Sequence, residues 1–137
     1  MESLSSHIYF SVNTTARQLS KLSDDHFKSY GLTSSYAFMV MAVHRTGTCK
    51  QKEICNRFNL APSTVSRFVD KLIKKDLIER KQDGKEVVLV LTNQGDLLAQ
   101  KLEDELIVLD AEIKKRLGDK YSHTLNRMLQ HGKEMLT

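Results

Sequence analysis

The sequence predicts a mainly α-helical fold in which a helix-turn-helix is followed by a two-stranded β-hairpin and flanked by long helices. Three observations support this fold class: the order of residue types from Gln51 to Asp70, two β-prone runs after that segment, and apolar stripes at helical spacing in both terminal regions. Together they account for nearly all of the 137 residues, and no Gly-, Ser- or Pro-rich linker divides the chain. We therefore expect a single domain.

The segment from Gln51 to Asp70 fits two short helices that meet at a tight turn. The inner face of the first helix is apolar, with Ile54, Cys55 and Phe58. Cys55 supplies a small side chain where the second helix must cross. Asn59 falls at the turn, where a positive φ is needed and asparagine is tolerated. Pro62, the only proline, suits the first turn of the second helix because its missing N–H breaks no hydrogen bond there.

The second helix, expected from Pro62 to Lys75, separates an apolar face from a short-chained, basic face. Its outer face carries the predicted base contacts Ser63, Thr64, Ser66 and Arg67, and the predicted phosphate contacts Lys71 and Lys74. Arg67 is the strongest candidate for base reading, because a guanidinium can meet O6 and N7 of guanine together. An ordinary helical hairpin with a solvated outer face is the alternative. The small crossing residue, the turn residue and the proline together favour DNA binding.

A β-hairpin is predicted directly after this helix. Ile78–Lys81 and Glu86–Leu91 are β-prone runs, and Asp83-Gly84 between them is a hairpin-turn signal. Cations near its tip are predicted to hold phosphates, namely Arg80, Lys81 and Lys85. A surface hairpin with solvated lysines is the alternative, but the position after a helix-turn-helix favours a wing that contacts nucleic acid.

The charge distribution agrees with this interpretation. From Arg45 to Lys85 the chain has 11 Lys and Arg against 5 Asp and Glu, a net charge of +6, whereas the other 96 residues carry −2. Positive charge concentrated on one segment favours binding to a polyanion through phosphate contacts and counterion release.

Long amphipathic segments flank this basic region. Apolar residues recur at helical spacing from residue 8 to about 30, from Thr33 to Gly47, from Thr92 to Gly118, and again to the end of the chain. The expected DNA-binding head spans residues 32–92, and the expected arms span residues 1–31 and 93–137. Apolar stripes that extend beyond a small head are most simply buried against a second copy, so a homodimer is expected. An intrachain hairpin of the last two helices is the alternative.

These residues resemble the MarR-type winged-helix transcription regulators over essentially the whole chain. The resemblance rests on Gly31-Leu32-Thr33, Ser63-Thr64-Val65-Ser66-Arg67, Leu77-Ile78-Glu79-Arg80 and Leu91-Thr92-Asn93-Gln94-Gly95. It implies a homodimer joined by the N- and C-terminal helices. One departure lies in the wing, where Asp83-Gly84-Lys85 has lysine in the place of the usual arginine, and lysine lacks the planar fork of a guanidinium.

The resemblance also implies a small aromatic or anionic effector, bound between the helical arms and the head. The candidate pocket residues are Phe10, Arg17, Phe38, Met41 and His44. Aromatic and Met side chains would line the pocket, and Arg17 or His44 could pair with a carboxylate or phenolate. The alternative is that these residues simply belong to the core.

Other classes of protein find little support. The longest apolar run, Ala37–Val43, is seven residues, too short to span a bilayer, and no signal peptide is recognised, so a cytoplasmic location is expected. Cys55 is expected in the core, and Cys49, close to Lys50 and Lys52, is expected to be partly exposed with a lowered pKa. We recognise no metal-ligand spacing, cofactor motif or catalytic triad, and therefore expect no cofactor and no enzyme activity.

The sequence thus predicts a sequence-specific DNA-binding transcriptional regulator, interpreted as a repressor that binds an inverted-repeat operator as a homodimer. One alternative is a winged-helix module that binds protein instead of DNA, and another is an effector sensor that has lost its affinity for DNA. The basic head argues against protein docking, because docking surfaces more often expose aromatic and aliphatic anchors.

Overall fold

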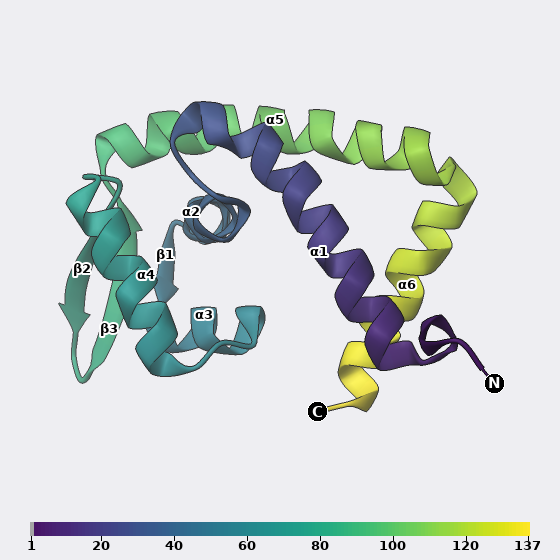
Figure 1. Ribbon diagram of the computed structural model, residues 1–137. Coiled ribbons are helices and arrows are strands. Elements are labelled where there is room, and N and C mark those ends of the chain that lie inside the picture. Colours follow the sequence, from purple (N-terminus) through teal and green to yellow (C-terminus); the bar gives the residue numbers. More distant parts are fainter. Residues whose placement is uncertain (1) are drawn as a thin grey trace. The chain divides into compact units, whose positions relative to one another are not determined.

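The computed structural model describes residues 2–137, which form six α-helices, two short 3-10 helices and one small sheet (Figure 1). In chain order the elements are η1 (Leu4–Ser6), α1 (Ile8–Phe27), η2 (Lys28–Tyr30), α2 (Ser34–Thr46), β1 (Thr48–Lys50), α3 (Gln51–Phe58), α4 (Pro62–Lys74), β2 (Ile78–Asp83), β3 (Glu86–Leu91), α5 (Asn93–Leu117) and α6 (Asp119–Met135). The chain divides into two compact units, residues 1–103 and 104–137, and the division falls within α5.

The helix-turn-helix forms as predicted. Asn59 adopts the left-handed conformation, with φ 52° and ψ 48°, at the end of α3, and Pro62 is the first residue of α4. Ile54 of α3 and Val65, Val69 and Leu72 of α4 are completely buried. The two helices therefore join the core through one apolar face each, and the polar face of α4 remains outside.

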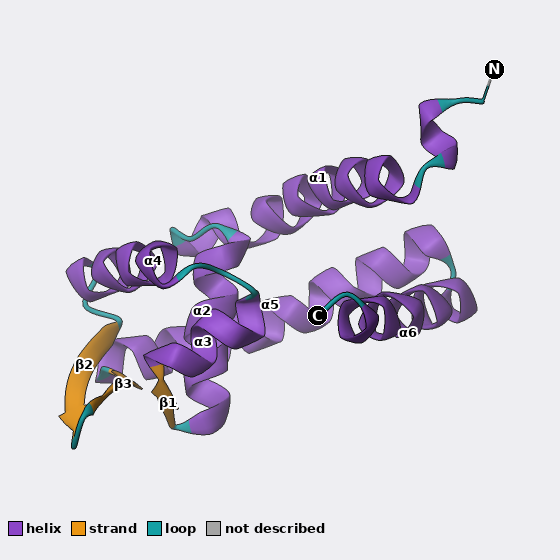
Figure 2. Ribbon diagram, turned by 90° about the horizontal axis from the view of Figure 1, so that it is seen from below, coloured by secondary structure: helices purple, strands orange, loops and turns teal. Residues whose placement is uncertain are grey.

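The predicted hairpin is confirmed, and the structure adds a third strand. β2 and β3 pair antiparallel from Ile78↔Leu91 to Asp83↔Glu86, and Gly84, with φ 62°, is the first residue of the two-residue turn between them. β1 pairs with the other edge of β3, giving the order β1-β3-β2 (Figure 2). The three residues of β1 were not predicted, since so short a strand shows no recognisable alternation.

Cys49 corrects one expectation about the cysteines. It lies in β1 opposite Leu89 and is completely buried. Burial is the main reason that the pKa of its thiol is raised, and the nearby charge of Glu53 raises it further. The prediction of a partly exposed cysteine with a lowered pKa is therefore wrong, because pairing with β3 turns this side chain towards the core.

The carboxylate of Asp24 ties the end of α1 to the start of α2. Thr33 is the N-cap residue of α2, as predicted, but its side chain makes no capping hydrogen bond. Instead, Oδ1 of Asp24 accepts hydrogen bonds from the Ser34 backbone N–H at 2.8 Å and from the Ser34 hydroxyl at 2.6 Å. An acidic group at this helix start also interacts favourably with the helix dipole.

Thr92 joins the sheet to α5. Its hydroxyl accepts a hydrogen bond from the Gly95 N–H at 2.9 Å and donates one to the Asp76 carbonyl at 2.6 Å, and its own N–H donates to the Leu77 carbonyl at 3.0 Å. Gly95 packs directly on the Leu77 carbonyl, so closely that a Cβ at this position would overlap the carbonyl oxygen. The first turn of α5 is therefore fixed against the turn that follows α4.

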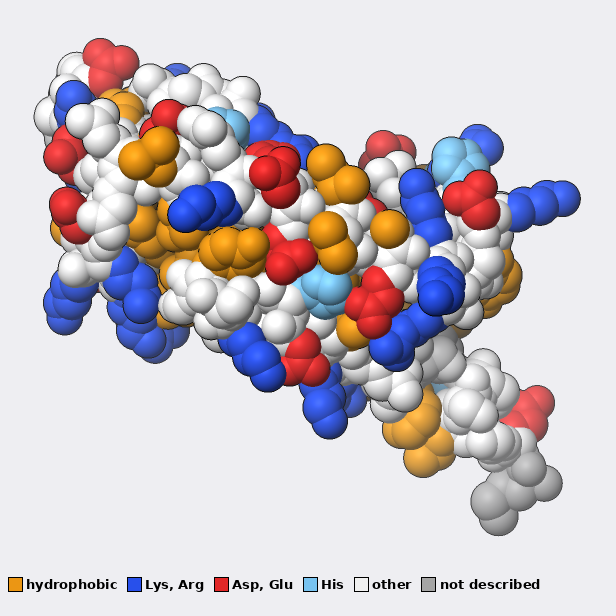
Figure 3. All heavy atoms as spheres, turned by 90° about the horizontal axis from the view of Figure 1, so that it is seen from above, with side chains coloured by type: hydrophobic (Ala, Val, Ile, Leu, Met, Phe, Trp, Pro, Cys, Tyr) orange, Lys and Arg blue, Asp and Glu red, His pale blue; other side chains and the backbone are white. Residues whose placement is uncertain are grey.

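Both units leave apolar side chains exposed. In residues 1–103 these include Ile8 and Tyr9, each 82% exposed, and in residues 104–137 they include Ile107 and Met128, 68% and 67% exposed. Figure 3, which views the molecule from the side of α5, shows hydrophobic side chains lying among charged ones. Where such side chains lie together, they form candidate contact surfaces for a partner. No helix in the described part of the chain is long and apolar enough to cross a membrane.

We expect Gly95→Ala to lower the free energy of unfolding by about 1–3 kcal/mol, because the added methyl group would overlap the carbonyl oxygen of Leu77 and force the backbone apart. Chemical denaturation followed by circular dichroism measures this difference. Gly132→Ala is the matched control: Gly132 is also helical, has open space where a Cβ would lie, and should gain about 0.5–1 kcal/mol from the better helix propensity of alanine. Equal effects of the two substitutions would contradict the close packing at Gly95.

Candidate nucleic-acid interface

The outer face of α4 presents the side chains predicted to contact DNA. Ser63, Arg67, Lys71 and Lys74 are exposed, whereas Thr64 and Ser66 are half-buried. Arg67 makes no hydrogen bond or ion pair with another described residue, so its guanidinium is available for a ligand. The first two turns of α4 thus combine short polar side chains with one unengaged arginine, which is a suitable surface for the edges of bases.

Arg80 of β2 reaches across from the wing to α4. Its Nη1 lies 2.6 Å from Oδ1 of Asp70, and its Nη2 donates to both the carbonyl and the hydroxyl oxygen of Ser66 at 3.2 Å. Its Nε donates to Oε1 of Gln51 at the start of α3, at 3.1 Å. One guanidinium therefore connects α3, α4 and the wing.

This geometry gives Arg80 a different place from the one predicted. The sequence suggested a phosphate contact near the tip of the wing, but the donors of Arg80 are directed at oxygens of the protein itself. The side chains of Arg80 and Asp70 are 31% and 54% exposed, so their ion pair alone contributes little to stability. The planar guanidinium, however, meets several acceptors at once and so fixes the orientation of the Arg80 side chain. The arrangement favours a role in holding the wing against α4.

Lys71 is held by an aromatic pair that the sequence did not reveal. The ring of Tyr36 in α2 lies on that of Phe68 in α4, with centroids 4.8 Å apart. The ammonium group of Lys71 lies 5.9 Å from the centroid of the Tyr36 ring, within the range of a cation–π interaction. Tyr36 thus restricts Lys71 to one part of the outer face of α4.

The tip of the wing keeps two unpaired lysines. Lys81 and Lys85 are exposed and make no ion pair within the described chain. Lys50 of β1, by contrast, lies 2.8 Å from the carboxylate of Glu86, and this hydrogen bond and charge raise the pKa of Lys50. Gln82 donates to the Gly84 carbonyl at 3.0 Å and so supports the turn. The positive charge of the wing that is free to meet phosphates therefore resides on Lys81 and Lys85.

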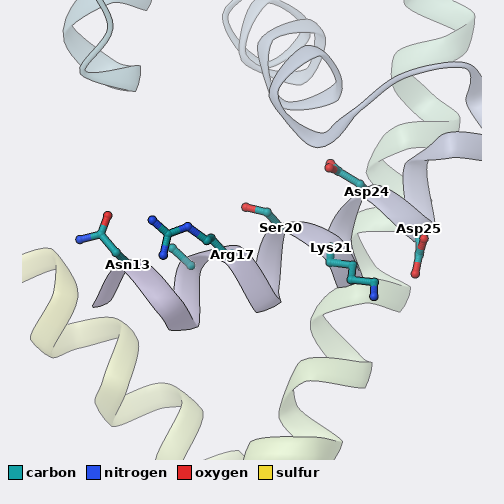
Figure 4. A pocket seen from close by; sticks show the side chains of 7 residues that line it. Asn13, Arg17, Ser20, Lys21, Asp24 and Asp25 are labelled. Atoms are coloured by element: carbon teal, nitrogen blue, oxygen red, sulfur yellow. The ribbon is translucent and has the colours of Figure 1, made fainter. Parts of the chain in front are cut away.

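Two of the five residues predicted for an effector pocket, Arg17 and His44, line different hollows. Arg17 lines a shallow hollow formed entirely by side chains of α1, including Asn13, Ser20 and Asp24 (Figure 4). His44 lines a separate one between α2, β3 and the start of α5. Phe10, Phe38 and Met41 line neither of the two. Phe38 packs edge-on against Phe27, with ring centroids 6.1 Å apart, and Met41 is buried in the core.

His44 lies between two acidic side chains of α5. Its Nε2 is 3.7 Å from Asp96 and its Nδ1 is 3.9 Å from Glu103. Arg45 holds Glu103 with two hydrogen bonds of 2.8 Å, and this contact lowers the pKa of the Glu103 carboxyl. The stabilisation from Glu103 is consequently present above the pKa of an unfolded glutamate and is lost as the pH falls through the lowered value. No group of three or more residues that could hold a metal ion is found in the described part of the chain.

Sequence reasoning missed the residues that position the interface. A cationic partner for Asp70 could have been predicted. Asp70 is a carboxylate on an otherwise basic helix face, four residues after Ser66. Gln51 and Tyr36 gave no such signal, since their partners lie 29 and 32 residues away in the sequence. Long-range contacts of this kind depend on the fold and leave no local pattern.

Comparison with known proteins supports the same interpretation. Residues 32–86 match the model of the MarR family. An uncharacterized HTH-type transcriptional regulator of Bacillus subtilis, YwoH, is 24% identical over 95% of this chain and 99% of its own length. The HTH-type transcriptional repressor MdtR of the same organism is 27% identical over 70% of this chain and 64% of its own length.

The fold is also similar to that of a solved structure. A crystal structure of a MarR mutant from E. coli, complexed with operator DNA, superimposes with a TM-score of 0.83 at 15% identity, covering 96% of this chain and 98% of that one. These relatives are transcriptional regulators and not enzymes. Residues 32–86 therefore match the MarR family, and the chain as a whole is similar to an HTH-type transcriptional regulator.

Proposed function

We propose that this regulator is a repressor that binds an inverted-repeat operator as a homodimer. The observation that carries the proposal is the outer face of α4, where Ser63 and Arg67 are exposed beside a wing that hydrogen bonds from Arg80 connect to α4. A similar protein, MdtR, is named a repressor, and the structurally similar MarR of E. coli has been crystallised with operator DNA. These two similar proteins support repression and operator binding as the proposed function.

In the proposed complex the start of α4 enters the major groove. Ser63, Thr64, Ser66 and Arg67 face base edges there, and Arg67 provides the main discrimination. Lys71, Lys74, Lys81 and Lys85 contact phosphates and set the register of the protein on the duplex. Arg80 acts as a positioning residue that keeps the wing at a fixed angle to α4.

The proposed homodimer would cover the apolar side chains that each unit exposes. A symmetric dimer presents two copies of α4, and a twofold axis requires a symmetric pair of half-sites. Release of the operator by a small effector also belongs to the proposal, implied by the family. Of the residues predicted for its pocket, Arg17 and His44 line separate hollows.

Arg67→Ala and Lys85→Ala are expected to affect DNA binding differently. Loss of Arg67 should remove about 1–3 kcal/mol of discrimination at one base position and leave binding to random DNA largely intact. Loss of Lys85 should weaken operator and random DNA alike and reduce the salt slope by about one. Fluorescence anisotropy at several salt concentrations, with operator fragments selected from random duplexes, measures both effects. Equal losses on the two DNAs for Arg67→Ala would make Arg67 a phosphate contact.

Arg80→Ala distinguishes positioning from phosphate contact. If Arg80 holds the wing, operator affinity should fall about tenfold with the salt slope unchanged, and Arg80→Lys should fail to restore it, because lysine cannot reach all the acceptors on α3 and α4 together. The matched control is Lys81→Ala, the neighbouring cation, which should lower the slope by about one. A reduced slope for Arg80→Ala, restored by lysine, would instead support the phosphate contact.

The dimer and the symmetric operator are tested together. Analytical ultracentrifugation should show a dimer at micromolar concentration, and footprinting should protect two half-sites whose centres lie about one helical turn, roughly 10 base pairs, apart. A monomer that protects a single asymmetric half-site would refute both features of the proposal.

A further inference from the structure

A hollow of about 490 Å³ lies between the end of η2, the turn after α4 and the first turns of α5, all within residues 1–103. It belongs to neither the DNA-binding face nor the residues predicted for an effector. Its volume is within the range of about 300–1,000 Å³ that is usual for small-molecule sites.

The floor of this hollow is aliphatic. Leu32 and Leu77 contribute to it and are themselves 5% and 4% exposed, so they are fixed parts of the core. Leu97 on the first turns of α5 also lines the hollow and is 64% exposed. An alkyl chain laid along these leucines would remove apolar surface from water, which is favourable.

The rim of the hollow is cationic. Lys75 and Lys101 both line it, and no aspartate or glutamate does. Neither lysine forms an ion pair with another residue of the described chain. Tyr30 adds a phenol hydroxyl, which can donate a hydrogen bond to an anion. The hollow therefore pairs an apolar floor with a positive charge that the protein does not neutralise.

We propose that this hollow binds an amphipathic anion, a medium-length alkyl chain that carries a carboxylate or phosphate head. The chain lies on the leucine floor and the head lies between Lys75 and Lys101. Two ammonium groups accept either head, because lysine acts as a point charge and does not impose a planar geometry. A bare inorganic ion is not the preferred ligand, since it would leave the exposed side chain of Leu97 in water.

A ligand in this hollow would contact residues at the end of α4 and at the start of α5. Leu77 follows α4, donates its N–H to the Leu72 carbonyl at 3.0 Å, and accepts a hydrogen bond from Thr92. A molecule that contacts Leu77 and Leu97 together bridges the end of α4 and the start of α5. Because this geometry exists only in the folded chain, the ligand should stabilise the protein against unfolding. The inference is independent of the proposed operator and of repression.

Isothermal titration of the full-length protein tests the proposal, using octanoate, octyl phosphate and octan-1-ol as probes. The two anions should bind and raise the melting temperature, and the neutral alcohol should bind at least about tenfold more weakly because it lacks the charge that meets Lys75 and Lys101. Whichever anion binds more tightly identifies the head group. Inorganic phosphate alone should not raise the melting temperature. Equal binding of octanol and octanoate, or no binding of either anion, would overturn the proposal.

Three substitutions locate the site. Lys75→Ala, Lys101→Ala and Leu97→Ser should each weaken binding of the preferred anion about fivefold or more, and because these side chains are exposed the melting temperature without ligand should change little. Lys114→Ala is the matched control: it removes an exposed lysine from α5 outside the hollow and should leave the affinity unchanged. If Lys114→Ala weakens binding as much as the other lysine variants, the anion is held by general charge and the site is refuted.

Discussion

The carbonyl group of Leu77 is the point at which the end of α4, the sheet and the long helix α5 are joined. It accepts a hydrogen bond from the Thr92 N–H, and Gly95 packs so closely on it that no side chain can be placed between them. The Thr92 hydroxyl, bonded to the neighbouring Asp76 carbonyl, caps α5 in the same place. A displacement of α5 is therefore passed directly to the residues that end α4, and the position of α4 depends on this contact.

Arg80 supplies a second connection, nearer the middle of α4. The Leu77 contact fixes the base of the hairpin, and the bonds from Arg80 to Ser66 and Asp70 fix its direction along the helix. Since Arg80 is paired, the net positive field of the outer face of α4 and the wing comes mainly from Arg67, Lys71, Lys74, Lys81 and Lys85. These side chains have no carboxylate partner among the described residues. Arg80 therefore positions the wing against α4, whereas other residues supply the unpaired positive charge.

The predictable parts of this structure have local causes. Asn59 at a positive φ, Pro62 at a helix start and Gly84 in a hairpin turn each satisfy a conformational requirement that a few neighbouring residues reveal. The unpredicted parts depend on residues that meet only after folding. The pairing of β1 with β3, which buries Cys49, and the bonds of Arg80 across 10 to 29 positions belong to this class. For the candidate site, the outer face of α4 could be predicted, whereas the partners that position it could not.

In the proposed DNA complex, lysine at the tip of the wing affects how the protein discriminates between sequences. An arginine placed in a minor groove responds to the width of that groove and can form two hydrogen bonds in one plane, whereas Lys85 offers a hydrated point charge. The neighbouring arginine, Arg80, is committed to α3 and α4 and cannot replace it without releasing the wing. A wing with only Lys81 and Lys85 available then contributes affinity that depends on salt more than on sequence. In the proposed complex, discrimination then comes from the first two turns of α4, and Arg67 has the most influence on the choice of operator.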